Sequence, residues 1–263
     1  MNDLFDVSGR TALVTGGSRG IGLMIARGLV EGGARVIVSS RKSADVQGAA
    51  EELARIGDCE AIPGDISTPE GAAALASATQ ERFPSLDILV NNAGAVWGAP
   101  LEDFPHEGWE KIVRTNVEGI FHLTVALLPS LRAAAQERGS ARVINIGSID
   151  GLRTPWVENY SYSASKAAVH MLTRHLAKRL AAEQITVNAI APGPFESKMM
   201  SVLEDPQIRK TIEAEVPLGR IGQPEDVAGL TLFLASRAGA YMTGTVIPLD
   251  GGITGCGAGA WGQ

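Results

Sequence analysis

The 263-residue sequence has few cysteines, few aromatic residues and no long apolar run. Cys59 and Cys256 lie far apart and have no zinc-ligand residues beside them, so we expect reduced thiols and no metal site. No apolar run approaches the ~18 residues that a membrane span needs. The N-terminal stretch 1–14 carries acidic residues early and lacks a basic region followed by an apolar one, so no signal peptide is expected. These absences predict a cytoplasmic protein with no membrane partner.

The sequence also lacks a concentration of positive charge. Its formal net charge is −6, and its lysines and arginines are scattered. A protein that binds nucleic acid usually carries a basic stripe or patch, so we expect no nucleic-acid partner. Aromatic residues make up only 5% of the chain, whereas apolar residues make up 45% and there are 31 glycines. This composition argues against disorder and favours small side chains packed between helices and a sheet.

Short apolar runs alternate with helical segments along the whole chain. Such nearly continuous runs are typical of strands buried on both faces. Segments between them have the helical period, as in 22–33 and 165–183. The alternation predicts an α/β fold: one Rossmann domain over 1–263 with a doubly wound parallel sheet of about seven strands and ligands beyond the strands' carboxyl ends. The predicted strands are 11–16, 35–40, 60–65, 86–94, 142–148, 185–193 and 245–252.

A glycine-rich turn, TGGSRGIG (15–22), follows the first predicted strand and opens the first helix. Gly16 permits a tight turn, and Gly20 and Gly22 allow the free N–H groups of the helix to approach a pyrophosphate. The spacing is G-x-x-x-G-x-G and not the general G-x-G-x-x-G fingerprint. The alternative is an ordinary strand-to-helix turn, but its position after the first strand favours a dinucleotide site.

Charge at the end of the second predicted strand indicates which dinucleotide is bound. NAD-binding sites usually place an acid there for the ribose 2′-hydroxyl, whereas an arginine accommodates a 2′-phosphate. Here that strand ends in Ser40 and Arg41, the first acid is Asp45, and Arg19 lies inside the glycine turn. The alternative is that both arginines are solvated surface residues. Their joint placement predicts NADP(H).

Two of the three tyrosines lie in the stretch YSYSASK, and only the second has a lysine one helical turn further on. Tyr162 and Lys166 are spaced i, i+4 and therefore share a helix face. A free phenol titrates near ~10, and a nearby ammonium together with a positive nicotinamide ring lowers that pKa. Tyr160 lies about 200° further round a helix, or in the preceding loop at the substrate's border. We expect Tyr162 to exchange the proton and Ser148, at the end of the fifth strand, to hydrogen-bond a substrate carbonyl.

Six short motifs occur along the chain in a fixed order: TGGSRGIG (15–22), NNAG (91–94), Asn116, Ser148, Tyr162-x-x-x-Lys166 and PG (192–193). Together they resemble the short-chain dehydrogenase/reductase family, and most closely its 3-oxoacyl reductase branch, which includes reductases associated with rhamnolipid synthesis. The resemblance covers residues from about 8 to 252 and implies four catalytic residues, of which Asn116 holds a water that links the lysine to solvent. Each has a structural alternative, such as a surface Tyr–Lys pair, a strand-capping serine or a turn asparagine.

The same resemblance extends the cofactor site. It implies adenine contacts from Asp65 and the backbone after it, and a floor of small side chains. Family members commonly have a threonine shortly after the PG pair, and here Ser197 is the nearest hydroxyl. The predicted cofactor-binding residues are Gly16, Ser18, Arg19, Gly20, Ile21, Gly22, Ser40, Arg41, Asp65, Ile66, Asn92, Ala93, Gly94, Tyr162, Lys166, Pro192, Gly193 and Ser197.

Three segments are expected to enclose the substrate: 95–100, 149–159 and a lid around 194–212. They offer an apolar wall that suits a 3-oxoacyl thioester or another bulky hydrophobic ketone. The alternative is that some of these side chains pack the lid or a neighbouring subunit. The predicted substrate-binding residues are Trp97, Ser148, Leu152, Trp156, Tyr162 and Met199.

Glu183 argues against an acidic carrier protein, because the resemblance places basic residues at that position in carrier-dependent relatives. The leading prediction is an NADPH-dependent ketoreductase. One alternative is an alcohol, sugar-alcohol or steroid dehydrogenase that works oxidatively. Another is a dinucleotide-sensing binding protein, which would have lost at least one catalytic position. The resemblance also implies a homotetramer built on helices at 107–137 and 158–182, and the glycine-rich tail 255–263 is expected to be flexible or to reach a neighbour.

Overall fold

The computed structural model describes residues 3–256, except for the side chains of Lys198, Met199 and Ser201. Seven parallel strands within this range form one sheet in the order β3-β2-β1-β4-β5-β6-β7. The predicted doubly wound sheet is therefore confirmed. The strand order reverses between β1 and β4, which places a crevice at their carboxyl ends. The strands are β1 Thr11–Thr15, β2 Arg35–Ser40, β3 Cys59–Pro63, β4 Ile88–Asn91, β5 Ala141–Ile146, β6 Ile185–Pro192 and β7 Val246–Leu249.

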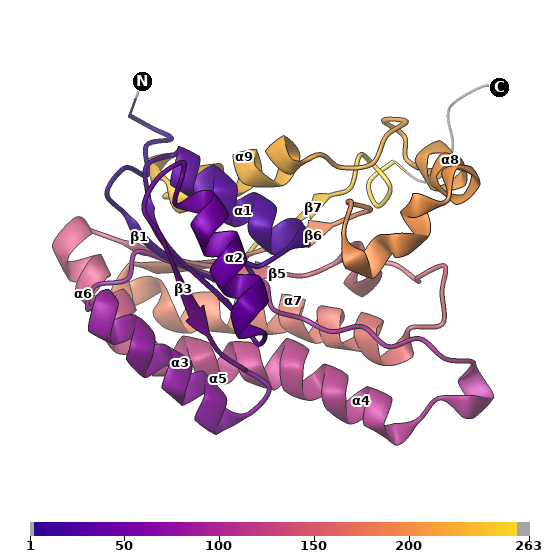
Figure 1. Ribbon diagram of the computed structural model, residues 1–263, viewed down its shortest axis with the longest axis horizontal. Coiled ribbons are helices and arrows are strands. Elements are labelled where there is room, and N and C mark those ends of the chain that lie inside the picture. The colour runs from indigo at the N-terminus through magenta and orange to yellow at the C-terminus, as the bar shows by residue number, and fades with distance from the viewer. Residues whose placement is uncertain (1–2, 257–263) are drawn as a thin grey trace.

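Helices cover both faces of the sheet (Figure 1), with α1, α2 and α9 on one face and α3, α5 and α7 on the other. Helix α7 begins five residues before the predicted start at 165, so Tyr162 and Lys166 lie in its first two turns. The helices are α1 Gly20–Glu31, α2 Ser43–Leu53, α3 Pro69–Arg82, α4 His106–Val113, α5 Gly119–Ala126, α6 Leu128–Arg138, α7 Tyr160–Leu180, α8 Pro206–Glu215 and α9 Pro224–Ala235.

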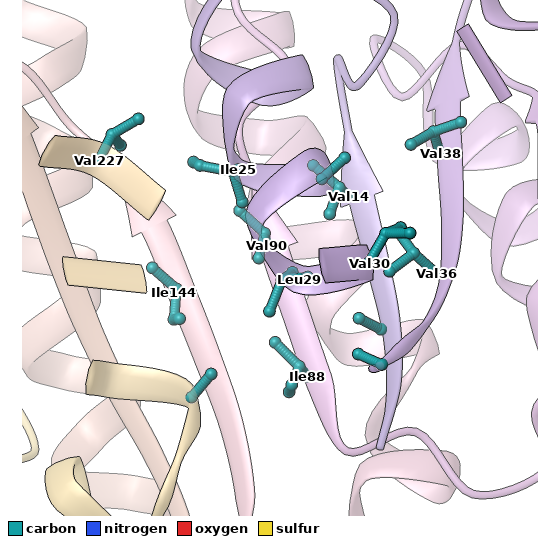
Figure 2. Close-up of a cluster of buried hydrophobic side chains, with 14 of the residues drawn as sticks. Val14, Ile25, Leu29, Val30, Val36, Val38, Ile88, Val90, Ile144 and Val227 are labelled. Carbon is teal, nitrogen blue, oxygen red and sulfur yellow. The ribbon is translucent and has the colours of Figure 1, made fainter. Parts of the chain in front are cut away.

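Apolar side chains fill the space between the sheet and α1 and α9 (Figure 2). Val14, Val90 and Ile144 project from the strands toward Ile25 of α1 and Val227 of α9. Because successive strand residues point to opposite faces, the neighbours of these strand residues fill a second core under α3, α5 and α7. Burying one such side chain contributes about 1.5–3 kcal/mol. Both faces are therefore anchored, and the strand ends that carry polar residues are held on a firm scaffold.

Two sequence expectations concern regions outside this scaffold. The tail 255–263 lies almost wholly outside the described residues. In the part of the chain that the structure describes, no single helix is long and apolar enough to cross a membrane. One pair, His106–Ala126 with Leu128–Arg138, meets that test only jointly and is bent by 55°.

Candidate active site

The glycine turn after β1 leads into a helix whose N-terminus has no side-chain cap. Gly16 and Gly20 adopt left-handed backbone angles, with φ of 64° and 53°, which a residue with a Cβ would adopt only under strain. Arg19 precedes the helix with extended backbone and no capping hydrogen bond, and the first turn of α1 contains no acid. Asn92 holds the turn, because its Nδ2 donates to the carbonyls of Thr15 at 3.0 Å and Gly16 at 3.1 Å. The N–H groups of the first turn are thus available to a pyrophosphate.

The turn after β1 lies beside the end of β2, since the backbone N–H of Gly17 donates to the carbonyl of Ser39, the next-to-last residue of that strand, at 3.1 Å. The turn and the segment after β2 each present one exposed arginine, Arg19 and Arg41. Neither takes part in an ion pair among the described side chains. The Oγ of Ser40, which precedes Arg41, is buried and has no hydrogen-bond partner among the described residues. The two cations and the uncapped helix fit a dinucleotide that carries an additional phosphate.

The floor of the crevice runs from the two arginines to the catalytic candidates. Asp65 is exposed and accepts a hydrogen bond from the Ser67 backbone at 3.0 Å, so one oxygen closes a turn while the other is not used there. Ile66 after it is buried. At the other end, a Cβ on Gly94 would lie 3.7 Å from Lys166 Nζ. The small residue leaves room beside the lysine for a ring or a sugar.

The catalytic candidates Ser148, Tyr162 and Lys166 come together where β5 ends against α7. Ser148 lies two residues after the end of β5 and caps a 3-10 turn, Ile149–Gly151, by accepting the Asp150 backbone N–H at 3.1 Å. Lys166 Nζ donates to the carbonyl of Ile146 at 2.8 Å, which ties α7 to the last residue of β5. The same Nζ lies 5.5 Å from the centroid of the Tyr162 ring. All three side chains are buried.

The protein environment of Tyr162 raises its pKa. Burial, with the charge of Asp150 as a lesser cause, raises the pKa of Tyr162 to about 12, and Ser148 opposes this by hydrogen bonding. Burial lowers the pKa of Lys166 to about 8, partly offset by Asp150. The expected lowering also counted the positive nicotinamide ring, and among the protein's own groups desolvation dominates. These residues therefore keep the phenol protonated, as a proton donor requires.

Asn116 lies in a single π-helical turn, Arg114–Glu118, between α4 and α5. Its Nδ2 donates to the Ala95 carbonyl and to Ser165 Oγ, both at 3.0 Å, and its Oδ1 accepts the Ala95 N–H at 2.8 Å. Both amide hydrogens are thus committed within the protein. A water bound at this residue must use the backbone carbonyl or the remaining lone pair of Oδ1. Isolated π-turns are frequent at functional sites.

Tyr160 lies on a different face of α7 from Tyr162. The helix begins at Tyr160 itself. Tyr162 is two positions further along, so the two side chains point in directions about 200° apart around the helix. Its hydroxyl donates to Glu158 Oε1 at 2.7 Å, and its ring packs edge-on against Phe104 at 5.6 Å between centroids. These contacts favour a structural role at the border of the site.

The apolar residues expected around the substrate divide into two groups. Trp97 is half-buried and packs against α4, with Lys111 Nζ 5.2 Å from its ring centroid. Leu152 and Trp156 are exposed, on the loop between β5 and α7. The guanidinium of Arg153 stacks 3.8 Å from the Trp156 ring centroid. The side chain of Met199 lies outside the described residues.

The segment after β6 is anchored at its base. Pro192 ends the strand, and the backbone N–H of Gly193 donates to the Leu249 carbonyl at 2.9 Å. Phe195 is buried in the first core, although it was assigned to the lid. A Cβ on Gly20 would lie 3.1 Å from Ser197 Cβ, so Ser197 reaches the N-terminus of α1. We therefore expect the Ser197 hydroxyl to lie near the pyrophosphate of the cofactor.

Sequence reasoning missed two polar residues near the catalytic candidates. Asp150, two residues after Ser148, influences the pKa of both Tyr162 and Lys166. His170 is buried one helical turn after Lys166, and its ring lies against Gly147 and Gly151. Its spacing of i, i+4 from the lysine was the one available signal.

The family model described as enoyl-(acyl carrier protein) reductase matches residues 16–254. Because it covers nearly the whole chain, the protein belongs to the short-chain dehydrogenase/reductase family of oxidoreductases. The resemblance predicted from the motifs is confirmed.

Within this family, the chain is similar to two 3-oxoacyl reductases. It is 51% identical to the rhamnolipids biosynthesis 3-oxoacyl-[acyl-carrier-protein] reductase of Pseudomonas aeruginosa over 96% of this chain and 99% of that protein. It is 37% identical to the 3-oxoacyl-[acyl-carrier-protein] reductase FabG of Vibrio cholerae, over 94% of this chain and 98% of the relative. The solved RhlG/NADP active-site complex of Pseudomonas aeruginosa superimposes with a TM-score of 0.94 at 51% identity, over 97% of this chain and 100% of that one.

Proposed function

We propose that the protein is an NADPH-dependent reductase of ketone carbonyls, with a 3-oxoacyl thioester or another bulky hydrophobic ketone as substrate. The observation that carries the proposal is the meeting of Ser148, Tyr162 and Lys166 at one end of a crevice with Arg19 and Arg41 at the other. The similar Pseudomonas aeruginosa proteins are named for this reaction and this cofactor. A sensing protein with a dead site would lack one of the four catalytic positions, and all four are present.

Each catalytic residue has a defined task in this reaction. NADPH, when bound, supplies the hydride that the carbonyl carbon accepts. Ser148 Oγ donates a hydrogen bond to the carbonyl oxygen and stabilises the negative charge that develops there. Tyr162, whose pKa is raised to about 12 by burial, gives its proton to that oxygen. Lys166 holds α7 against the end of β5, and the resulting phenolate regains a proton from solvent past Asn116.

The cofactor would be held mainly by backbone and by two cations. The uncapped first turn of α1, with Ser18 and Ile21 beside the glycines, receives the pyrophosphate. Arg19, Ser40 and Arg41 receive the 2′-phosphate. The remaining contacts follow the crevice through Asp65, Ile66, Asn92, Ala93, Gly94, Lys166, Pro192, Gly193 and Ser197.

The charge near Glu183 bears on the choice of carrier. Arg132 Nε and Arg179 Nη1 each lie 2.6 Å from the Glu183 carboxylate, so two cations surround one acid. The surface at this point therefore carries a net positive charge, and the acid by itself is a weaker argument against a carrier-linked thioester than the sequence suggested. Leu152 and Trp156 supply apolar surface for an acyl chain.

We further propose a one-domain homotetramer in the cytoplasm with a lid around 194–212. Exposed apolar side chains gather on the helices expected to carry the subunit contacts, including Phe121 and Val125 on α5 and Met171 on α7. Large exposed apolar side chains on adjacent helices support an interface.

The test is a panel of NADPH-oxidation assays over 3-oxoacyl thioesters, cyclic diketones and steroid ketones, repeated with NADH. We expect turnover of at least one ketone class and a preference for NADPH. Assays with NADP⁺ and the matching alcohols measure the oxidative direction. No turnover of any ketone would contradict the proposal, and faster alcohol oxidation at neutral pH would favour the dehydrogenase alternative.

A further inference from the structure

We propose that Asp150 selects substrates by charge and disfavours ketones that carry an anionic group close to the reacting carbonyl. The inference rests on the proposed ketone reductase function and narrows its substrate class. It would make a neutral 3-oxoacyl thioester a good substrate and the corresponding free 3-oxo acid a poor one, although the two share the same carbonyl.

The backbone places the Asp150 carboxylate next to the carbonyl-binding hydroxyl. Asp150 follows Ser148 by two residues in the 3-10 turn, and its N–H donates to Ser148 Oγ at 3.1 Å. Its Oδ2 accepts a hydrogen bond from Asn159 Nδ2 at 3.0 Å, and Asn159 immediately precedes α7. The carboxylate is thus fixed at the base of the loop that carries Leu152 and Trp156. Asp150 is partly exposed, so the turn does not bury its side chain completely.

No cation neutralises Asp150 among the ion pairs of the described side chains. Arg153, the next cation along the loop, stacks on Trp156 and donates to the Thr154 carbonyl at 3.1 Å. Lys166 Nζ donates to the Ile146 carbonyl and forms no ion pair with the carboxylate among the described side chains. An anion near the carbonyl would therefore meet an unpaired negative charge in a partly desolvated site.

The field of Asp150 reaches the reacting groups. It raises the pKa of Tyr162 and also that of Lys166, the direction that a nearby negative charge produces for both an acid and a base. A substrate carboxylate held beside Ser148 would feel the same field. In a partly desolvated site, repulsion between Asp150 and a substrate carboxylate is expected to lower the affinity for the acid relative to the thioester by about 10- to 100-fold.

The test compares a 3-oxoacyl N-acetylcysteamine thioester with the free 3-oxo acid of the same chain length. The measured quantity is the ratio of kcat/KM for the acid to that for the thioester, in the full-length protein with NADPH. Asp150→Asn keeps an oxygen for the Asn159 hydrogen bond and removes the charge. We expect it to raise the ratio at least about 10-fold, mainly through KM of the acid. Asp150→Glu should retain the wild-type ratio, and Asp103→Asn, an exposed acid elsewhere, is the matched control.

Equilibrium binding keeps the result separate from the proposed function. The affinities of a 3-hydroxy acid and its neutral methyl ester are measured by calorimetry with NADP⁺ present. Preference for the ester in wild type, lost in Asp150→Asn, supports charge selection even if no ketone is turned over. A ratio that stays unchanged in folded Asp150→Asn, by kinetics or by binding, would overturn the inference.

Discussion

At the residue scale, some properties of the pair Tyr162 and Lys166 could be predicted from the sequence and others could not. Their identity and i, i+4 spacing are visible in the chain, and the structure places both on α7 beside Ser148. The direction of the Tyr162 pKa shift was not predictable, because it depends on burial and on Asp150. Burial and three-dimensional neighbours are set by packing, and a single sequence does not display them.

The proposed roles of Arg19 and Arg41 yield a prediction about the cofactor. Under the proposed function, Arg41→Ala, and likewise Arg19→Ala, removes a charge-assisted hydrogen bond to the 2′-phosphate, a contact worth about 1.5–3 kcal/mol. We expect KM for NADPH to rise about 10- to 100-fold while KM for NADH changes little.

Steady-state kinetics with both cofactors measure this effect. Arg55→Ala, an exposed arginine just past the C-terminus of α2, is the control and should change neither constant. An equal loss for NADPH and NADH in the Arg41 variant would show that the arginine does not recognise the phosphate.

At the element scale, His170 of α7 packs against the loop that carries Ser148. A Cβ on Gly147 would collide with Nε2 of this buried imidazole. A Cβ on Gly151 would lie 2.7 Å from backbone atoms of both Lys166 and Ala167 and 2.8 Å from His170 Cε1. Both glycines therefore make room for the imidazole, and Gly151 also makes room for the helix backbone.

These contacts predict that a larger side chain at 147 can be compensated by a smaller one at 170. Gly147→Ala overpacks the contact between the loop and α7, and it should lower the free energy of unfolding by about 1–3 kcal/mol. It should also lower kcat, because Ser148 is displaced. Combining it with His170→Ala should recover part of both losses, since the colliding ring is removed. Gly151→Ala should not be recovered by His170→Ala, because the helix backbone remains.

Urea denaturation and kcat of the single and double variants measure the coupling. Additive losses in the Gly147→Ala, His170→Ala double variant would contradict the packing account of this contact.

At the scale of the whole molecule, the alternation of strands and helices sufficed to predict a doubly wound sheet with its site at the carboxyl ends. The alternation carries this information because parallel strands require crossovers, which are right-handed. Positions in irregular segments were harder to predict. Phe195 is buried in the core, and Trp97 packs on α4. An apolar residue in a loop belongs to no periodic pattern, so the sequence does not indicate which surface it packs against.

The central claim is that this fold brings a protonated tyrosine to a carbonyl held next to NADPH. The most direct measurement is a single turnover of the full-length protein mixed with NADPH and a ketone that the panel identifies, followed by loss of NADPH absorbance. Wild type and Tyr160→Phe should both oxidise the cofactor. Tyr162→Phe should still bind NADPH and react at least about 100-fold more slowly, because the proton donor is missing. Reaction of folded Tyr162→Phe at the wild-type rate would contradict the account.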